Sequence, residues 1–225
     1  IATDGDADRL GVIDDKAEFL HPNKILVLLY YYLMRYRGWR GAAVRNLATT
    51  HLLDRIAEDF GETCYEVPVG FKYVSAKMVE TGAIIGGESS GGLTVRGHIQ
   101  GKDGIYAAAL LVEAIAKTGR RLSALWDEIT QKYGAAEMAE HDFHFSSAER
   151  TRIFKLLMED KQLPEFPCEI AKVSYMDGCK VYFKNGGWVI ARFSGTEPLL
   201  RVFCEMDTME NAEKIAKILT EFLSL

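Results

Sequence analysis

The sequence is poor in the features that mark several protein classes. Its 225 residues include only five prolines and four cysteines. The cysteines lie far apart and match no zinc-knuckle or dense disulfide spacing, so we expect reduced thiols in a cytoplasmic protein. The longest apolar run, residues 25–34, falls well short of the ~18 residues that a membrane-spanning helix needs. We therefore expect no insertion into a membrane.

The charge balance also narrows the classes of partner. The net charge is −5, so no overall positive field exists to attract nucleic acid. A content of 48% hydrophobic and 26% charged residues is typical of a globular protein. The chain opens on Ile1 and reaches an acidic motif at once, with no initiator methionine or leader. We therefore expect it to be part of a longer protein.

The first half of the chain alternates strand and helix signals. That alternation predicts a parallel or mixed sheet covered by helices, in a mixed α/β/α sandwich. The glycine-rich stretch 87–92 directly follows a short apolar run and is expected to be a loop. The expected strands are 10–14, 42–48, 63–67 and 83–86, and the expected helices are 22–37, 50–60, 70–81, 103–117 and one capped by Ser123 that runs to Tyr133.

The second half has a different pattern. Residues 134–140 form the best candidate for a linker, and residues 135–225 are expected to be a smaller α+β domain with a four-stranded antiparallel sheet. The Asp-Gly and Asn-Gly pairs at 177–178 and 185–186 are strong signals for two-residue hairpin turns. The expected strands are 168–176, 179–184, 188–193 and 200–206, between helices at 147–158 and from about 207.

Three carboxylates at alternate positions open the chain. Asp4, Asp6 and Asp8 precede Arg9, with small residues between them, so one turn can direct all three side chains to one point. Because the carboxylates repel one another, such a cluster favours a hard divalent cation such as Mg²⁺ or Ca²⁺. A solvated acidic turn remains an alternative. A calcium EF-hand is a second one, since Asp15 falls at the twelfth position, but Arg9 stands where that loop needs glycine.

Other stretches favour anions and hydroxyl groups. Residues 192–198 with Arg201 offer guanidinium groups, hydroxyls and backbone N–H groups to a tetrahedral anion, although an ordinary hairpin is the alternative. The loop 87–92 offers Glu88 and two hydroxyls among glycines, which suits sugar hydroxyls or a plain turn. Lys72 and Lys102 each stand near the start of an expected helix, where an anion is favoured.

Taken in order, the motifs at 4–9, 69–72, 87–92, 102–104 and 192–198 resemble the α-D-phosphohexomutase family, which includes phosphoglucomutase and phosphomannomutase. Members have four domains around a central cleft. The resemblance implies that residues 1–20 end domain 2, residues 21–134 form domain 3 and residues 135–225 form domain 4. The missing amino-terminal domains, which carry the phosphorylated serine, would then be partners of this chain.

The resemblance also implies roles for individual residues. The metal ligands, for one Mg²⁺ per complete site, are Asp4, Asp6 and Asp8. The catalytic residues at the reacting end are Arg9, Lys72 and Lys102. The substrate-binding residues are Glu88 and Ser90 for sugar hydroxyls, and Arg192, Ser194, Gly195, Thr196 and Arg201 for the phosphate that is not transferred.

The implied reaction interconverts hexose 1-phosphate and hexose 6-phosphate through a bisphosphate intermediate. Because the phosphoserine is absent, we expect this carboxy-terminal portion to be inactive alone. The alternative is a non-catalytic sugar-phosphate binding module. A histidine that often follows the sugar-binding pair in phosphomannomutase-like members is Gly92 here. This difference leaves the general base open and favours a phosphoglucomutase-like member, without distinguishing glucose, mannose or other sugar phosphates.

Overall fold

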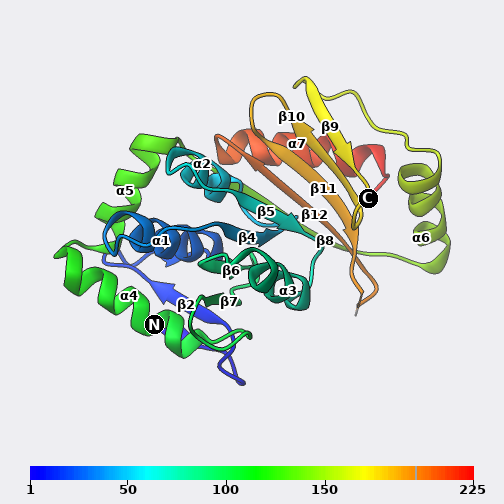
Figure 1. Cartoon of the computed structure of the whole chain (residues 1–225). Coiled ribbons are helices and arrows are strands. Elements are labelled where there is room, and N and C mark those ends of the chain that lie inside the picture. Colours follow the sequence, from blue (N-terminus) through cyan, green and yellow to red (C-terminus); the bar gives the residue numbers. More distant parts are fainter. Residues whose placement is uncertain (196) are drawn as a thin grey trace. The chain divides into compact units, whose positions relative to one another are not determined.

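The backbone of the computed structural model, described for residues 1–195 and 197–225, forms two units. The first unit comprises Ile1–Gly134 and the second Ala135–Leu225 (Figure 1). Each unit has its own strands and its own covering helices.

The first unit contains two sheets. Its main sheet has the strand order β5-β4-β6-β7, in which β4 runs parallel to β5 and β6 while β7 is antiparallel to β6. A small antiparallel sheet joins β1, β2 and β3. The strands are β1 Ala2–Thr3, β2 Leu10–Ile13, β3 Phe19–Leu20, β4 Ala43–Asn46, β5 Cys64–Val67, β6 Ile85–Gly87 and β7 Leu93–Val95. The helices are α1 Pro22–Arg35, α2 Leu52–Asp59, α3 Phe71–Thr81, α4 Gly104–Thr118 and α5 Leu122–Tyr133.

Two adjacent glycines allow helices to approach both faces of β6. A Cβ atom added at Gly86 would lie 2.4 Å from Sδ of Met78 and 2.6 Å from Cγ1 of Val74, both in α3. One added at Gly87 would lie 2.7 Å from Cδ1 of Leu26 in α1. Because successive side chains point to opposite faces of a strand, α3 and α1 cover opposite faces of the sheet (Figure 1).

Helix α1 is apolar on nearly every side and is buried accordingly. Residues 25–34 are at most 3% exposed, and the helix contacts α2, α4 and α5 as well as β2. It begins with Pro22 in its first turn, where a missing N–H costs no hydrogen bond. The apolar run is therefore the central helix of a covered layer.

The second unit is a five-stranded antiparallel sheet in the order β8-β12-β11-β10-β9. One apolar core includes residues of β10, β11 and β12 together with Ile153 of α6 and Ile215 of α7. The strands are β8 Glu137–His144, β9 Ile170–Ser174, β10 Cys179–Phe183, β11 Trp188–Phe193 and β12 Leu199–Met206. The helices are α6 Ser147–Phe154, a π-helical turn at Lys155–Glu159 and α7 Met209–Phe222.

The prediction of four strands in this sheet is wrong. Strand β8 occupies most of the stretch predicted as a linker and pairs with β12 from Glu137↔Met206 to His144↔Leu199. Its sequence is rich in charge because it is an edge strand with one partner and a largely solvated face, so it lacks a strong apolar alternation. The two hairpin turns are confirmed, with Gly178 and Gly186 at φ values of +92° and +90°.

Two smaller expectations also differ from the structure. The glycine-rich loop is shorter than predicted, since Gly87 ends β6 and Leu93 begins β7. Ser123 does not cap α5, whose N-cap residue is Arg121. Instead, the Ser123 hydroxyl and N–H donate to the carboxylate of Asp15 at 2.7 and 3.1 Å.

The helices of the described residues are all too short or too polar to cross a membrane.

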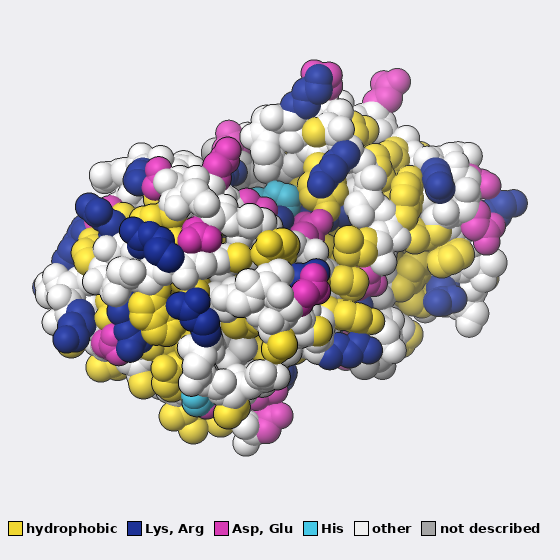
Figure 2. All heavy atoms as spheres, in the orientation of Figure 1, with side chains coloured by type: hydrophobic (Ala, Val, Ile, Leu, Met, Phe, Trp, Pro, Cys, Tyr) yellow, Lys and Arg dark blue, Asp and Glu magenta, His cyan; other side chains and the backbone are white. Residues whose placement is uncertain are grey.

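Side chains of both charge signs are interspersed on the face drawn in Figure 2. Dark blue Lys and Arg side chains lie among magenta Asp and Glu side chains there. This distribution agrees with the modest net charge of −5.

The close approach of α3 to β6 predicts the effect of Gly86→Ala. The added methyl overlaps Met78 and Val74, so we expect the free energy of unfolding to fall by about 1–3 kcal/mol. Denaturant unfolding of Gly86→Ala, Met78→Ala and the double variant measures it. Met78→Ala should cost less in the Gly86→Ala background, because it removes an overlapping side chain. Strictly additive losses would contradict this packing argument.

Candidate functional site

The acidic motif forms the turn between β1 and β2. Ala7 at its centre has a φ of +58°, and its N–H donates to the carbonyl of Asp4 at 3.1 Å. Ligand oxygens of Asp4, Asp6 and Asp8 all lie within 4.8 Å of one another. The turn therefore brings the three predicted carboxylates to one point.

Two cations balance part of this negative charge. Nε of Arg9 contacts Oδ2 of Asp4 at 2.6 Å, and Nζ of Lys102 contacts Oδ2 of Asp8 at 2.5 Å. Desolvation opposes ionisation of Asp4, but hydrogen bonds from the Arg9 backbone and guanidinium outweigh it and lower the pKa of that carboxyl. Arg9 and Lys102 therefore lie at the carboxylate cluster.

The donor set fits a hard divalent cation. All ligands are carboxylate oxygens, which Mg²⁺ and Ca²⁺ prefer. Oδ1 of Asp8 is buried, and within the described part of the chain it has no hydrogen-bond donor. Nε of Arg9 lies 3.6 Å from this oxygen, too far for a hydrogen bond, so a bound cation could still satisfy it. The residues present thus suit Mg²⁺ chemistry.

The EF-hand alternative is wrong. A β-strand, β1, precedes the acidic turn, whereas the EF-hand needs an entering helix. Asp15, which would have to supply the last ligand, bonds instead to the N–H and hydroxyl of Ser123.

The predicted sugar loop lies beside the acidic turn. An isolated β-bridge joins Gly92 to Arg9, and Ser90 lines a surface hollow of about 450 Å³ together with Asp4 and Arg9. Ser90 is exposed, whereas Glu88 is only 8% exposed. The loop is closed by a hydrogen bond from the Glu88 N–H to the Gly92 carbonyl at 2.9 Å.

The glycine at position 92 makes room for Lys102. A Cβ atom there would lie 2.2 Å from Cδ of Lys102, so the lysine stem occupies the space that any side chain at 92 would take. Gly104, at the start of α4, likewise allows a close approach: its N–H donates to the Ala7 carbonyl at 2.9 Å. The sequence marked Lys102 as a candidate site residue. It predicted neither the packing of the Lys102 stem against Gly92 nor the hydrogen bond from Gly104 to Ala7.

Lys72 is not brought to this cluster. It is exposed at the start of α3, with Nζ 4.9 Å from the ring centre of Tyr73. It does lie two residues after Gly70, whose N–H donates to Glu88 at 3.0 Å.

The predicted phosphate loop lies between β11 and β12 of the second unit. Arg192 and Arg201 are direct cross-strand partners, so both guanidinium groups start from the same face of the sheet. Carboxylates compensate them: Asp177 accepts from Nε of Arg192 at 2.9 Å, and Glu197 accepts from Nη2 of Arg201 at 3.2 Å. Two guanidinium groups on one face of a sheet repel each other, and an anion bound by both would offset that repulsion. The arginine pair therefore suits an anion.

Hydroxyl and backbone groups complete this loop. The Ser194 N–H donates to the Leu199 carbonyl at 2.8 Å, and the Ser194 hydroxyl accepts from the Glu197 N–H at 3.3 Å. Gly195 is exposed, with open space where a side chain would stand. Thr196, also predicted to bind phosphate, lies outside the described residues.

Two histidines of the first unit, His98 and His51, each lie beside a carboxylate. Nε2 of His98 lies 2.7 Å from Oδ2 of Asp103, and its ring stacks on Tyr106 at 4.0 Å between centroids. Nε2 of His51 lies 3.6 Å from Oε2 of Glu66.

Comparison with known families gives two matches. The family model for the α/β/α domain III of phosphoglucomutase/phosphomannomutase matches residues 21–133, and the model for the C-terminal domain of the same family matches residues 154–222. Together the two matches cover most of the chain.

Individual relatives agree with these matches. A phosphoglucomutase/phosphomannomutase of Thermococcus kodakarensis is 33% identical over 97% of this chain and 45% of the relative. A crystal structure from Thermus thermophilus with a provisional phosphomannomutase name has a TM-score of 0.80 and 31% identity, covering 100% of this chain and 45% of that one. Aspergillus fumigatus N-acetylphosphoglucosamine mutase, solved with GlcNAc-6P and magnesium, shares the fold with a TM-score of 0.60 and 17% identity. The match covers 97% of this chain and 50% of that one. The chain spans about half the length of the relatives that it matches.

The position of Lys102 predicts how the acidic turn binds metal. Lys102→Met removes an ammonium group that neutralises Asp8, so we expect Mn²⁺ to bind about threefold to tenfold more tightly. Calorimetric titration with Mn²⁺ measures the change, with Lys77→Met, whose lysine pairs with Glu80, as the control. Unchanged or weaker binding by Lys102→Met would show that the lysine does not compete for the carboxylate.

The N-cap of α4 predicts a pH dependence. Hydrogen bonds from the Tyr106 N–H, and then from His98, lower the pKa of Asp103 below its usual 3.8. A lowered pKa stabilises the fold above pH 3.8, and that contribution is lost as pH falls through the folded-state value. Asp103→Asn keeps a capping oxygen but not the charge. Its melting temperature should be lower at pH 7 and approach that of the unaltered chain below pH 3.8; a constant difference would contradict this.

Proposed function

The chain belongs to the phosphoglucomutase/phosphomannomutase family, and from this premise we propose that it is the carboxy-terminal half of a phosphohexomutase. The whole protein would interconvert hexose 1-phosphate and hexose 6-phosphate through a bisphosphate intermediate, an isomerase reaction. The observation that carries the proposal is the presence of two local sites of matching chemistry. One presents a carboxylate and a hydroxyl beside an acidic turn, and the other presents paired arginines.

In the first unit, Glu88 and Ser90 bind sugar hydroxyls. A carboxylate accepts two hydroxyl hydrogen bonds in a fixed geometry, and the serine hydroxyl can donate or accept. Both groups lie on the short loop between β6 and β7, whose glycines let a ring approach the backbone. These two side chains can therefore hydrogen-bond to hydroxyls that are present in both the hexose 1-phosphate and the hexose 6-phosphate.

In the second unit, Arg192, Ser194, Gly195, Thr196 and Arg201 bind the phosphate that is not transferred. Guanidinium groups bind phosphate oxygens through paired N–H donors. The carboxylates of Asp177 and Glu197 orient the two arginines before the ligand arrives. A hexose phosphate carries both hydroxyls and phosphate, and each unit presents groups that suit one of these two chemistries.

At the reacting end, Arg9, Lys72 and Lys102 would stabilise the transferring phosphoryl group, and Asp4, Asp6 and Asp8 would hold Mg²⁺. When bound, the metal would supply a positive charge that neutralises phosphoryl oxygens. Arg9 supplies donors to the phosphoryl oxygens, and Lys102 can hold or deliver a proton at Nζ. The Nζ group of Lys102 already contacts the acidic turn, which supports this assignment. The assignment of Lys72 to the reacting end is supported by its place in the family motif alone.

The phosphoserine that carries the phosphoryl group belongs to domains that this chain does not contain, so we propose that the chain alone is inactive. Residues 1–20 would end domain 2, residues 21–134 would be domain 3 and residues 135–225 domain 4. The missing domains would be its partners. The four cysteines are free thiols, which supports a cytoplasmic location.

Ligand titration tests this function. The chain should bind glucose 1-phosphate or mannose 1-phosphate more tightly than inorganic phosphate, because only the sugar phosphates reach Glu88 and Ser90. Arg192→Ala should weaken binding of both kinds of ligand about tenfold or more, since it removes a charged hydrogen-bond donor. Glu88→Gln should weaken only the sugar phosphates. Calorimetry or NMR titration measures these affinities for the unaltered chain, for Arg192→Ala and for Glu88→Gln.

The control is Arg121→Ala, whose side chain is 80% exposed and which should bind like the unaltered chain. Equal affinity for sugar phosphate and inorganic phosphate would contradict a sugar-reading site and favour the alternative of a simple anion-binding module. Turnover by the pure chain would contradict the claim that it is inactive without the missing domains.

A further inference from the structure

The carboxylate of Glu88 is held from outside its own loop. Its Oε1 accepts one hydrogen bond from Nδ2 of Asn46 at 2.9 Å and one from the Gly70 N–H at 3.0 Å. Both hydrogen bonds that the structure describes to this carboxylate are made to Oε1. Two donors therefore fix the orientation of the carboxylate, and among the described residues neither of these bonds uses Oε2.

The orientation of Asn46 is itself determined. Its Oδ1 accepts from the Ala48 N–H at 2.9 Å and from the Thr49 hydroxyl at 2.8 Å. Since a backbone N–H can only donate, the oxygen of the amide must face Ala48, and the nitrogen must face Glu88. Asn46 is 3% exposed, so bulk solvent does not compete for these hydrogen bonds.

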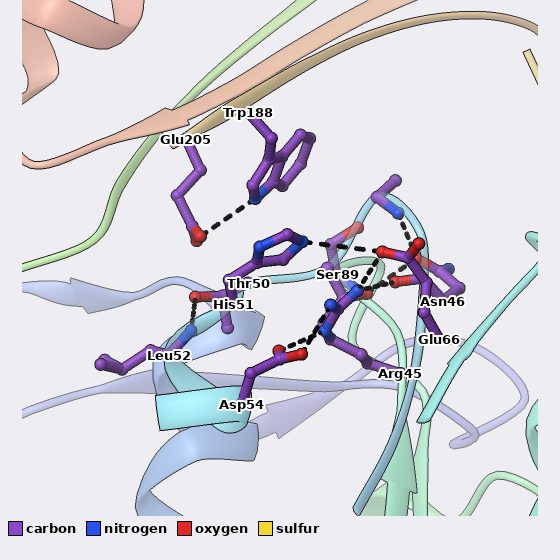
Figure 3. A network of polar contacts seen from close by, with 12 residues as sticks. Arg45, Asn46, Thr50, His51, Leu52, Asp54, Glu66, Ser89, Trp188 and Glu205 are labelled. Atoms are coloured by element: carbon purple, nitrogen blue, oxygen red, sulfur yellow. Dashed lines mark hydrogen bonds and ion pairs between the residues drawn. The ribbon is translucent and has the colours of Figure 1, made fainter. Parts of the chain in front are cut away.

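Thr49 holds the next residue of the sugar loop. Its Oγ1 accepts from the Ser89 N–H at 3.0 Å while donating to Asn46, and the residue is fully buried. The same hydroxyl therefore joins the amide that orients Glu88 to the backbone that precedes Ser90. Figure 3 shows Asn46 and Ser89 at this junction.

The buried end of β4 supports these contacts. Arg45, which precedes Asn46 and is 3% exposed, donates from Nε and Nη2 to both oxygens of Asp54 at 2.7 and 2.9 Å. Its Nη1 donates to Glu66 at 2.6 Å (Figure 3). A buried arginine held by two carboxylates keeps the strand end from moving.

We propose that Asn46 and Thr49 are positioning residues of the sugar site: they fix Glu88 and Ser89 so that the loop distinguishes a sugar phosphate from a bare phosphate. This inference rests on the proposed function for the ligand, but the positioning itself is a property of the chain. Neither residue touches the ligand. Their effect is on the preference between two ligands, beyond any effect on folding.

The decisive variant is Thr49→Val, which keeps the shape and removes the hydroxyl. We expect its affinity for glucose 1-phosphate to fall about tenfold and its affinity for inorganic phosphate to stay unchanged, because inorganic phosphate needs only the second unit. Amide hydrogen exchange followed by NMR should show that the Ser89 N–H loses protection. Thr49→Ser keeps the hydroxyl and should restore both properties.

Thr50→Val is the matched control. Thr50 is 3% exposed and its hydroxyl accepts from the Leu52 N–H at 3.1 Å, at the start of α2 (Figure 3). Its loss should lower stability without changing the ligand preference. Asn46→Asp is a second variant: it keeps the acceptor for Thr49 but replaces the donor to Glu88, and should lose the preference as Thr49→Val does.

The outcomes separate the two claims. If the unaltered chain prefers glucose 1-phosphate and Thr49→Val keeps that preference with a protected Ser89 N–H, the positioning role is wrong. If Thr49→Ser fails to restore the preference, the hydroxyl is not the cause. If the unaltered chain shows no preference, the proposed function fails, while loss of Ser89 protection in Thr49→Val alone would still support the anchoring of the loop.

Discussion

The close packing of helices on both faces of β6 is the constraint on which the first unit depends. Gly86 and Gly87 have no side chains, so α3 and α1 approach the strand within a distance that a methyl group would prevent. The chain leaves this tightly fixed strand and enters Glu88 directly. A residue that follows a strand held from both sides has little freedom of position, which is what a hydrogen-bonding site needs.

Charge compensation is the second constraint, and both units meet it in the same way. Three carboxylates in the acidic turn are neutralised in part by Arg9 and Lys102. In the second unit the charges are reversed, and carboxylates neutralise two arginines that face each other across strands. In both places the like charges stay together because counter-charges lie beside them, Arg9 and Lys102 in the acidic turn and Asp177 and Glu197 in the second unit. Without those partners, mutual repulsion would spread the groups apart.

The sequence was sufficient for the features that depend on local chemistry. Apolar periodicity, helix-ending glycines and the Asp-Gly and Asn-Gly turns predicted most elements, and the spacing of Asp4, Asp6 and Asp8 predicted their convergence. It failed for β8, because a charged edge strand pairs through its backbone and shows little apolar alternation. It also gave no indication of Asn46 and Thr49. Their partners lie about 40 residues further along the chain, and ordinary polar residues at a strand end carry no motif.

The same reasoning explains why recognition groups can be ordered within each unit. Glu88 is oriented by donors from β4 and from the residue that precedes α3, and Arg192 by Asp177, all from the same unit as the group they hold. A guanidinium has five N–H donors, and the described bond to Asp177 uses the one on Nε. Within the described part of the chain, the carboxylate therefore directs the planar group through Nε, while the terminal nitrogens keep donors for a phosphate. Groups that are fixed before the ligand arrives lose less conformational entropy on binding, so a pre-oriented site favours selectivity at modest contact area.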